Sequence, residues 1–311
     1  MAYASLENLK LPSKPLHLAI GMFDGVHLGH QSVIEAAIQS ARRTGGIAGV
    51  LTFWPHPSKL FRPDDPTQLI MPIEAKEAFL TEMGVGCVIA QEFDRAFAAI
   101  EAADFPAHLK KKLPTLAAIY VGENFRFGKG RSGDVKQLVE VSRSCGLHVF
   151  SAERIKFDGE PISSTRIRAC LSEGRMEQAN ALLGYAYGFM GAVVPGRQLG
   201  GELGFPTLNF HWEPELKPRF GVYTVRVRPS KGGDWLNGVA NYGLRPSITE
   251  SVKHPLLEVH LMAPTRLGPG AELEIEWLHF LRAEKKFEDL AELKAQIGKD
   301  RDAAEEYFRH A

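Results

Sequence analysis

The first half of the chain alternates apolar runs of strand length with segments of helical periodicity. The runs span residues 16–20, 47–53, 85–90, 116–121 and 147–151. Helices are expected from about Gly29 to Thr44 and at 73–83, mostly over 99–113, and at 134–145 with Asp134 as the cap. The apolar face of the first helix consists of Val33, Ile34, Ala37, Ile38 and Ala41. Apolar strands separated by helices are typical of a parallel sheet that is covered on both faces. The pattern therefore predicts a doubly wound α/β domain, in which ligands bind at the carboxyl ends of the strands.

The turn after the first strand combines glycine with histidine. It reads Gly-Met-Phe-Asp-Gly-Val-His-Leu-Gly-His from Gly21 to His30. A strand-to-helix turn directs backbone N–H groups and the positive end of the helix dipole at one point, which suits an anion. Gly25 and Gly29 let a ligand approach without meeting a Cβ. The imidazoles of His27 and His30 can donate hydrogen bonds to a phosphoryl group, although a metal pair or a structural pair remains open here.

Two further segments carry polar side chains beside glycine or at a helix start. Residues 121–134 mix Phe125 and Phe127 with arginine, lysine and glycine, as expected of a loop that grips a planar phosphorylated ligand. A solvated surface loop is the alternative. Residues 161–168 read Pro-Ile-Ser-Ser-Thr-Arg-Ile-Arg, in which the hydroxyls can cap a helix and Arg166 and Arg168 favour a phosphate.

These three segments resemble known motifs. Gly-x-Phe-Asp-Gly-x-His-x-Gly-His is similar to the nucleotidyltransferase signature. With Asn124-Phe-Arg-Phe-Gly128 and the Ser-Ser-Thr-Arg-Ile-Arg run, residues 14–185 resemble the FAD synthetase module of the bifunctional bacterial riboflavin kinase/FMN adenylyltransferases. The resemblance implies adenylyl transfer from ATP to FMN. The residues it implies are His27, His30 and Arg166 for catalysis, Gly21, Phe23, Asp24, Gly25, Gly29, Asn124, Ser163, Ser164 and Thr165 for the nucleotide, and Phe125 and Phe127 for the flavin.

The second half has a different pattern. A helical linker at 174–183 ends at Gly184, and short alternating runs then appear at 188–194, 221–227, 235–240, 256–261 and 271–280. Such runs between glycine and proline turns predict a small antiparallel β-barrel, which an amphipathic helix at 287–308 follows. We therefore expect two domains, residues 1–185 and 186–311.

A glycine-rich string opens this second domain. It runs from Gly196 to Asn209 and places glycines at 196, 200, 201 and 204, which permits a loop close to phosphate, although a plain β-turn is the alternative. Thr207 and Asn209 offer oxygens to a hard cation such as Mg²⁺. On strand 256–261, Glu258 and His260 share one face, opposite to Leu257 and its apolar neighbours, and a polar outer strand face explains this pattern equally well.

The string resembles the Gly-x-Pro-Thr-x-Asn motif of riboflavin kinases, and the strings around 221, 238 and 258 match that module in order. The resemblance implies that Glu258 is the base for the ribityl hydroxyl and that Arg282 approaches the flavin. It also assigns Gly196, Gly204 and Pro206 to the nucleotide, and Thr207 and Asn209 to Mg²⁺. Three departures are Tyr185-Ala186, Ser247 after Arg245-Pro246, and the loop from Met262 to Gly270, which lacks the acids and tyrosine of the family and is expected to shape the flavin pocket.

Composition narrows the partners. Lys plus Arg equals Asp plus Glu at 37 each, so no net field attracts nucleic acid or an anionic membrane. Three scattered cysteines fit a reducing cytoplasm, and neither a signal-peptide pattern nor a run of about 20 apolar residues is visible. The two resemblances imply an enzyme that uses ATP and Mg²⁺ to convert riboflavin to FMN and FMN to FAD, and the sequence indicates no protein partner.

Three alternatives stay open at this point. The chain could be an FAD synthetase with a degenerate kinase barrel. It could transfer a nucleotidyl group to another phosphorylated cofactor precursor. It could also be a non-catalytic regulator that binds a flavin or a nucleotide. The intact His-x-Gly-His pair disfavours the regulator, and the barrel's Gly-Phe-Pro-Thr-Leu-Asn string disfavours another precursor.

Overall fold

The computed structural model describes residues 5–196, 204–244 and 255–310 of the chain. These form two compact units, Met1–Ser164 and Thr165–Ala311. The domain boundary expected between 185 and 186 stays a prediction. No helix in the described part of the chain is both long and apolar enough to cross a bilayer.

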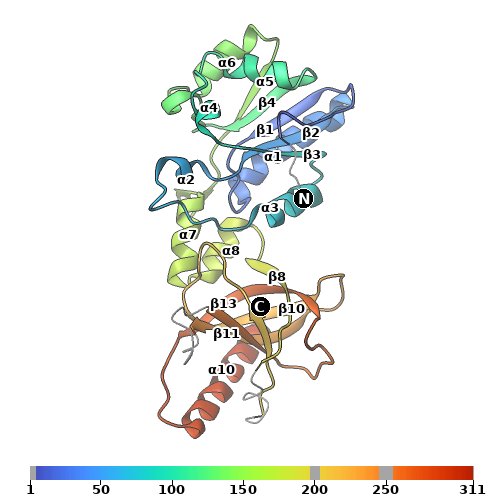
Figure 1. The fold of residues 1–311 in the computed structure, drawn as a ribbon. Helices are drawn as coiled ribbons and strands as arrows, with labels where there is room; N and C mark the ends of the chain where they lie inside the picture. The colour runs from blue at the N-terminus through green and yellow to red at the C-terminus, as the bar shows by residue number, and fades with distance from the viewer. Residues whose placement is uncertain (1–4, 197–203, 245–254, 311) are drawn as a thin grey trace. The chain divides into compact units, whose positions relative to one another are not determined.

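A five-stranded parallel sheet forms the centre of the first unit (Figure 1). Its strands are β1 (Leu16–Ile20), β2 (Ile47–Phe53), β3 (Cys87–Gln91), β4 (Leu116–Gly122) and β5 (His148–Ala152). They lie in the order β3-β2-β1-β4-β5, and each neighbouring pair is parallel. The predicted doubly wound sheet is confirmed. The strand order reverses between β1 and β4, which makes their carboxyl ends the switch point where such sheets bind ligands.

Helices cover both faces of this sheet. They are α1 (Leu28–Thr44), α2 (Pro57–Phe61), α3 (Ile73–Glu82), α4 (Arg95–Ala98), α5 (Phe105–Lys112) and α6 (Val135–Arg143). One core cluster joins Leu18 of β1 to Leu109 of α5 and Leu138 of α6. The other joins Ala19 to α1 and α3. Alternate residues of β1 therefore serve opposite layers, as a doubly covered strand requires.

One predicted helix is shorter than its expected range. Residues 99–113 were expected to be mostly helical, and α5 begins at Phe105. Pro106 in its first turn explains the late start, because proline has no N–H to donate to an upstream helical turn and its ring would clash with the carbonyl four residues earlier. Pro106 is buried, so the position is also fixed by packing. A short hairpin, β6 (Lys156–Phe157) and β7 (Glu160–Pro161), follows β5 and was not predicted.

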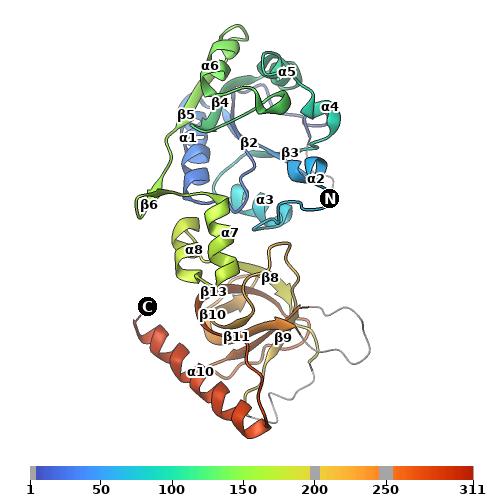
Figure 2. The same ribbon diagram turned by 90° about the vertical axis from the view of Figure 1, so that its left-hand side faces the viewer.

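The second unit contains a six-stranded antiparallel sheet followed by a C-terminal helix (Figure 2). Helices α7 (Ser164–Glu173) and α8 (Met176–Leu183) precede it. Its strands are β8 (Gly188–Ala192), β9 (Leu208–His211), β10 (Gly221–Pro229), β11 (Leu236–Leu244), β12 (Pro255–Leu261) and β13 (Glu272–Ala283), and α10 (Leu290–His310) ends the chain. The order is β8-β13-β10-β11-β12-β9. A bridge between Val194 and Asn209 joins the two edges, so the sheet nearly closes into the predicted barrel.

Aromatic rings fill the interior of this barrel. Tyr223, Tyr242 and Trp277 are fully buried, and the rings of Tyr223 and Trp277 lie 4.5 Å apart. Strand β9 was not predicted, because four residues that include the polar Asn209 give too short an alternation to recognise.

Candidate functional site

The turn from Gly21 to His30 lies at the switch point of the first unit. β1 ends at Ile20, α1 begins at Leu28, and the neighbouring β4 ends at Gly122, where the 122–134 loop begins. Because β1 and β4 are parallel neighbours, the turn and this loop begin at the same edge of the sheet. The turn has positive φ at Phe23 (47°) and Val26 (33°). A positive φ is a genuine outlier for a β-branched residue such as valine. Surrounding contacts must therefore hold this turn in place.

Several polar contacts do so. The Asp24 carboxylate is buried, and its two oxygens accept the Ile70 N–H at 3.0 and 3.2 Å. The Ser164 hydroxyl donates to the Asp24 carbonyl at 2.9 Å. Lys76 Nζ donates to the Met22 carbonyl at 2.8 Å, and Thr52 Oγ1 donates to the same oxygen at 2.9 Å. Asp24 was expected to contact the nucleotide; in the structure its carboxylate ties the turn to the segment before α3.

The two histidines are stacked. Their ring centroids lie 3.6 Å apart at an interplanar angle of 17°. His27 is the N-cap of α1, and its Nδ1 accepts the His30 backbone N–H at 3.3 Å. A ring nitrogen that accepts carries no proton, so the neutral His27 ring has its proton on Nε2 and presents an N–H donor there. A Cβ at Gly29 would lie 3.2 Å from His27 Cε1, so glycine leaves this ring its space.

The backbone adds donors to the imidazoles. The first N–H groups of an α-helix have no intrahelical acceptor, which applies to Leu28 and Gly29 at the start of α1. Within the described residues, the Phe23 N–H also donates to no acceptor. A cluster of N–H groups at the positive end of a helix dipole favours a phosphate.

The loop after β4 divides its two phenylalanines between core and surface. Phe127 is only 5% exposed and lies 5.3 Å from the Phe105 ring. Phe125 is half-buried and stacks parallel to Phe127 at 5.8 Å, while Asn124 is exposed. Asp134 caps α6 as predicted, since its carboxylate accepts the Gln137 N–H at 2.9 Å. Phe125 therefore offers a ligand more ring surface than Phe127; the flavin contact of both stays a prediction.

The Ser-Ser-Thr-Arg run spans the division between the two units. Ser163 and Ser164 fall in the first unit, and Thr165, Arg166 and Arg168 fall in the second. Ser164 lies inside the first turn of α7, so it is a helical residue that also bonds to the Asp24 carbonyl. The predicted grip of Ser163, Thr165 and Arg166 on the polyphosphate stays a prediction.

In the barrel, the sheet register brings predicted residues together. Glu258 of β12 lies directly opposite Asn209 of β9 and, on its other side, opposite Asn241 of β11. Directly opposed residues have their Cβ atoms about 4.5–5.5 Å apart on one face of the sheet. Leu257 and Val259 are fully buried, whereas Glu258 and His260 are half-exposed, so the predicted face assignment is confirmed.

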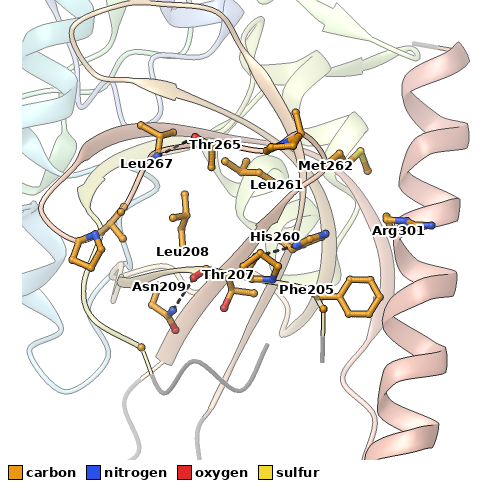
Figure 3. Close-up of a pocket in the computed structure, with 18 of the residues that line it drawn as sticks. Phe205, Thr207, Leu208, Asn209, His260, Leu261, Met262, Thr265, Leu267 and Arg301 are labelled. Atoms are coloured by element: carbon orange, nitrogen blue, oxygen red, sulfur yellow. Dashed lines mark hydrogen bonds between the residues drawn. The ribbon is translucent and has the colours of Figure 1, made fainter. Parts of the chain in front are cut away.

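A cavity of about 1040 Å³ opens beside these strands (Figure 3). Segments 193–196, 204–209, 260–265 and 267–269 line it, together with Arg301 and Glu305 of α10. The glycine-string residues Gly196, Gly204, Pro206, Thr207 and Asn209 all belong to this lining; Glu258 does not. The volume is at the upper end of ordinary ligand pockets, which leaves room for a nucleotide. Pro206 is fixed there, because its carbonyl lies 2.9 Å from His260 Nδ1.

Gly196 packs directly on Asn209. A Cβ at this position would lie 2.3 Å from Asn209 Nδ2, so only glycine fits without a shift. Asn209 is itself 5% exposed. Gly200, Gly201 and Arg245 to Ser247 lie outside the described residues. The Met262 loop lines the same cavity as Gly196, and the expectation that it shapes the flavin pocket stays a prediction.

The Arg282 guanidinium has a protein partner. It donates to both oxygens of Asp300 on α10, at 2.8 and 2.7 Å, and Asp300 is 7% exposed at its side chain. This bidentate pair attaches the C-terminal helix to β13. Its approach to the flavin stays a prediction.

The donor set at Thr207 and Asn209 fits a magnesium nucleotide better than a metal cage. The described residues contain no cluster of three His, Cys, Asp or Glu side chains that could hold a metal. Mg²⁺ is usually bound through one or two protein oxygens together with phosphates and waters. Thr207 directly precedes β9, and Asn209 lies on that strand opposite Glu258. The two residues therefore offer that small number of protein oxygens.

Comparison with known proteins matches a family to each half of the chain. The FAD synthetase family model matches residues 10–166, and the riboflavin kinase model matches residues 183–308. Proteins named bifunctional riboflavin kinase/FMN adenylyltransferase are 35% identical in Escherichia coli K12 (96% of this chain and 94% of that protein) and 36% identical in Haemophilus influenzae (94% of each). The chain belongs to this family. The Bacillus subtilis riboflavin kinase/FMN adenylyltransferase is 35% identical over 94% of this chain and 92% of its own length.

A solved structure shares the fold. The crystal structure of a Streptococcus pneumoniae protein, described as a macrolide-efflux protein, superposes with a TM-score of 0.86 at 25% identity and covers 97% of each chain. Both halves of this riboflavin kinase/FMN adenylyltransferase family member therefore have a counterpart in one solved chain.

Sequence reasoning missed three residues that support these sites. Lys76 and Thr52 hold the Met22 carbonyl, and Asn241 stands opposite Glu258. A signal existed for Lys76: it lies on the apolar stripe of α3 with Ile73 and Leu80, where a lysine is unusual. Asn241 was part of a recognised string, but nothing in the sequence indicated its register partner.

Proposed function

We propose that the chain makes FAD in two steps. In the barrel, riboflavin and ATP give FMN and ADP. At the switch point of the parallel sheet, FMN and a second ATP give FAD and pyrophosphate. The observation that carries the proposal is the stacked His27–His30 pair among backbone donors at the start of α1. Residues 1–185 and 186–311 are the proposed adenylyltransferase and kinase domains, and the free cysteines support the cytoplasmic location expected above.

Adenylyl transfer needs orientation and charge stabilisation. An oxygen of the FMN phosphate attacks the α-phosphorus of ATP, the bond to the β-phosphate bridge breaks, and pyrophosphate leaves without a covalent enzyme intermediate. The Nε2–H of His27, His30 and the N–H groups of Leu28 and Gly29 stabilise the charge that grows on the phosphoryl oxygens. Ser164, Thr165 and Arg166 hold the polyphosphate, Asn124 positions substrate, and Phe125 offers its ring to the flavin.

The kinase step needs a base, because a primary hydroxyl is a poor nucleophile. Glu258 takes the proton from the ribityl hydroxyl as that oxygen attacks the γ-phosphorus and ADP leaves. Thr207 and Asn209 are the residues that would hold Mg²⁺, which when bound neutralises charge on the phosphates. Gly196, Gly204 and Pro206 form the wall along which the nucleotide lies. Asn209 and Asn241 flank Glu258 and restrict the positions its carboxylate can take.

Two assays on the purified chain test the proposal. Incubation with FMN, ATP and Mg²⁺ should give FAD by chromatography, and incubation with riboflavin, ATP and Mg²⁺ should give FMN. His27→Ala and His30→Ala should each lower FAD synthesis by roughly 10²–10³-fold, the size of a lost transition-state donor. Full FAD synthesis in both variants would remove the histidine assignment.

The barrel has its own discriminating variant. Glu258→Gln should lower FMN formation by roughly 10²–10⁴-fold while FAD synthesis from supplied FMN is unchanged. Equal kinase rates in the wild type and the variant would remove Glu258 as the base. Absence of FMN in the wild type would leave an FMN adenylyltransferase with an inactive barrel, and absence of both products would refute the proposal.

A further inference from the structure

Lys76 is a buried lysine beside the turn that carries the histidines. It is 2% exposed, on the apolar face of α3. Its Nζ donates to the Met22 carbonyl at 2.8 Å and to Thr52 Oγ1 at 3.2 Å. Lysine is almost never fully buried unless its ammonium is paired, so these two hydrogen bonds are what allows a lysine at this position.

These contacts fix the orientation of one peptide group. The Met22 carbonyl accepts from both Lys76 and Thr52. In a trans peptide the C=O and the following N–H point in opposite directions, so the Phe23 N–H is directed away from Lys76. That N–H donates to no acceptor among the described residues, and it belongs to Phe23, which is one of the residues with positive φ in the turn.

We propose that Lys76 is a positioning residue for adenylyl transfer, which holds the Met22–Phe23 peptide so that the Phe23 N–H donates to the transferring phosphates. The inference rests on the proposed function of the first unit. Lys76 touches neither substrate; it acts through the peptide that it holds. Thr52 supplies the second hydrogen bond to the Met22 carbonyl, and we call these two hydrogen bonds the clamp.

The charge of Lys76 makes the clamp sensitive to pH. Burial lowers the pKa of the Lys76 ammonium to about 8, and the Asp24 carboxylate opposes the shift. The other groups that contact Nζ, the Met22 carbonyl and the Thr52 hydroxyl, are neutral. A charge-assisted hydrogen bond is about twice as strong as a neutral one, so the clamp weakens as pH rises through about 8.

The test compares variants of the full chain in both assays. Lys76→Met removes the ammonium but keeps most of the volume, and Lys111→Met, at an exposed lysine of α5, is the matched control. We expect Lys76→Met to lower kcat for FAD formation by roughly 10–10²-fold, as for a catalytic group displaced by about 1 Å, with KM for FMN changed less than about threefold. The riboflavin kinase rate of the same sample, and both rates of Lys111→Met, should equal the wild type.

The pH profile separates positioning from a merely structural role. In the wild type kcat for FAD formation should fall above pH about 8, and this decline should be absent in Lys76→Met. A kcat within twofold of the wild type in Lys76→Met, or the same alkaline decline in both proteins, would overturn the inference. If Lys76→Met does not fold, Thr52→Val replaces it: a loss of at least about threefold in kcat supports the clamp, and no loss overturns it. A wild type that makes no FAD from FMN refutes the proposed function instead.

Discussion

Gly196→Ala is expected to slow the kinase by displacing the side-chain amide of Asn209. The new Cβ would lie 2.3 Å from Asn209 Nδ2 and 2.7 Å from its Cγ, whereas ordinary contacts begin at 3.4 Å. Asn209 is 5% exposed and paired across the sheet with Glu258, so it has little room to retreat. Relief therefore requires a displacement of about 1 Å in the Asn209 side chain or in the glycine string. A misplacement of that size costs about 10²-fold in rate where geometry matters.

Both activities of the chain serve as readouts for this variant. FMN formation from riboflavin should fall by roughly 10–10²-fold, and FAD formation from supplied FMN should stay at the wild-type rate. Gly268→Ala is the matched control, because Gly268 lines the same cavity but a Cβ there meets nothing within 4 Å. Its kinase rate should remain within about twofold of the wild type. Equal kinase losses in the two alanine variants, or unchanged activity in Gly196→Ala, would refute the steric argument.

Three further predictions concern stability. Phe127→Ala should lower the free energy of unfolding by about 3–5 kcal/mol in a denaturant titration, because its ring is buried against Phe105. Asp300→Ala should cost about 2 kcal/mol, below the roughly 3–5 kcal/mol of a fully buried pair, since the Arg282 side chain is 23% exposed; an unchanged melting temperature would contradict this. The folded pKa of Lys76 lies below its unfolded value of 10.5, so the unfolded state binds the extra proton between pH 8 and 10.5. Stability should therefore rise with pH across that window, by up to about 3 kcal/mol, and Lys76→Met should lack this increment.

Patterns with a regular period were predicted well. The apolar stripe predicted for the first helix consists of the same residues that are buried in α1, because a helix that covers a sheet buries its apolar face. Asp134 was predicted as a cap because its bond is local, to a residue three positions along. The barrel strands were recognised by alternation, except β9, which is four residues long.

Long-range polar contacts were not predictable in the same way. The Asp24 carboxylate meets the Ile70 N–H, 46 positions away, and Lys76 meets the Met22 carbonyl across 54. No sequence period connects such partners, since they depend on how a loop packs after the sheet has formed. The register that sets Asn209 and Asn241 beside Glu258 likewise depends on how three separate strands pair, and β9 lies more than 40 residues before β12 in the chain.

The edges of the six-stranded sheet meet at Asn209, where the Val194 N–H donates to the Asn209 carbonyl at 2.8 Å. The main chain of this residue closes the barrel while its side chain lines the cavity. A nucleotide that binds only the closed form lowers the population in which this hydrogen bond is broken. The amide proton of Val194 should therefore exchange with solvent deuterium more slowly when a nucleotide fills the cavity. Its exchange rate would then measure how much of the kinase site is occupied.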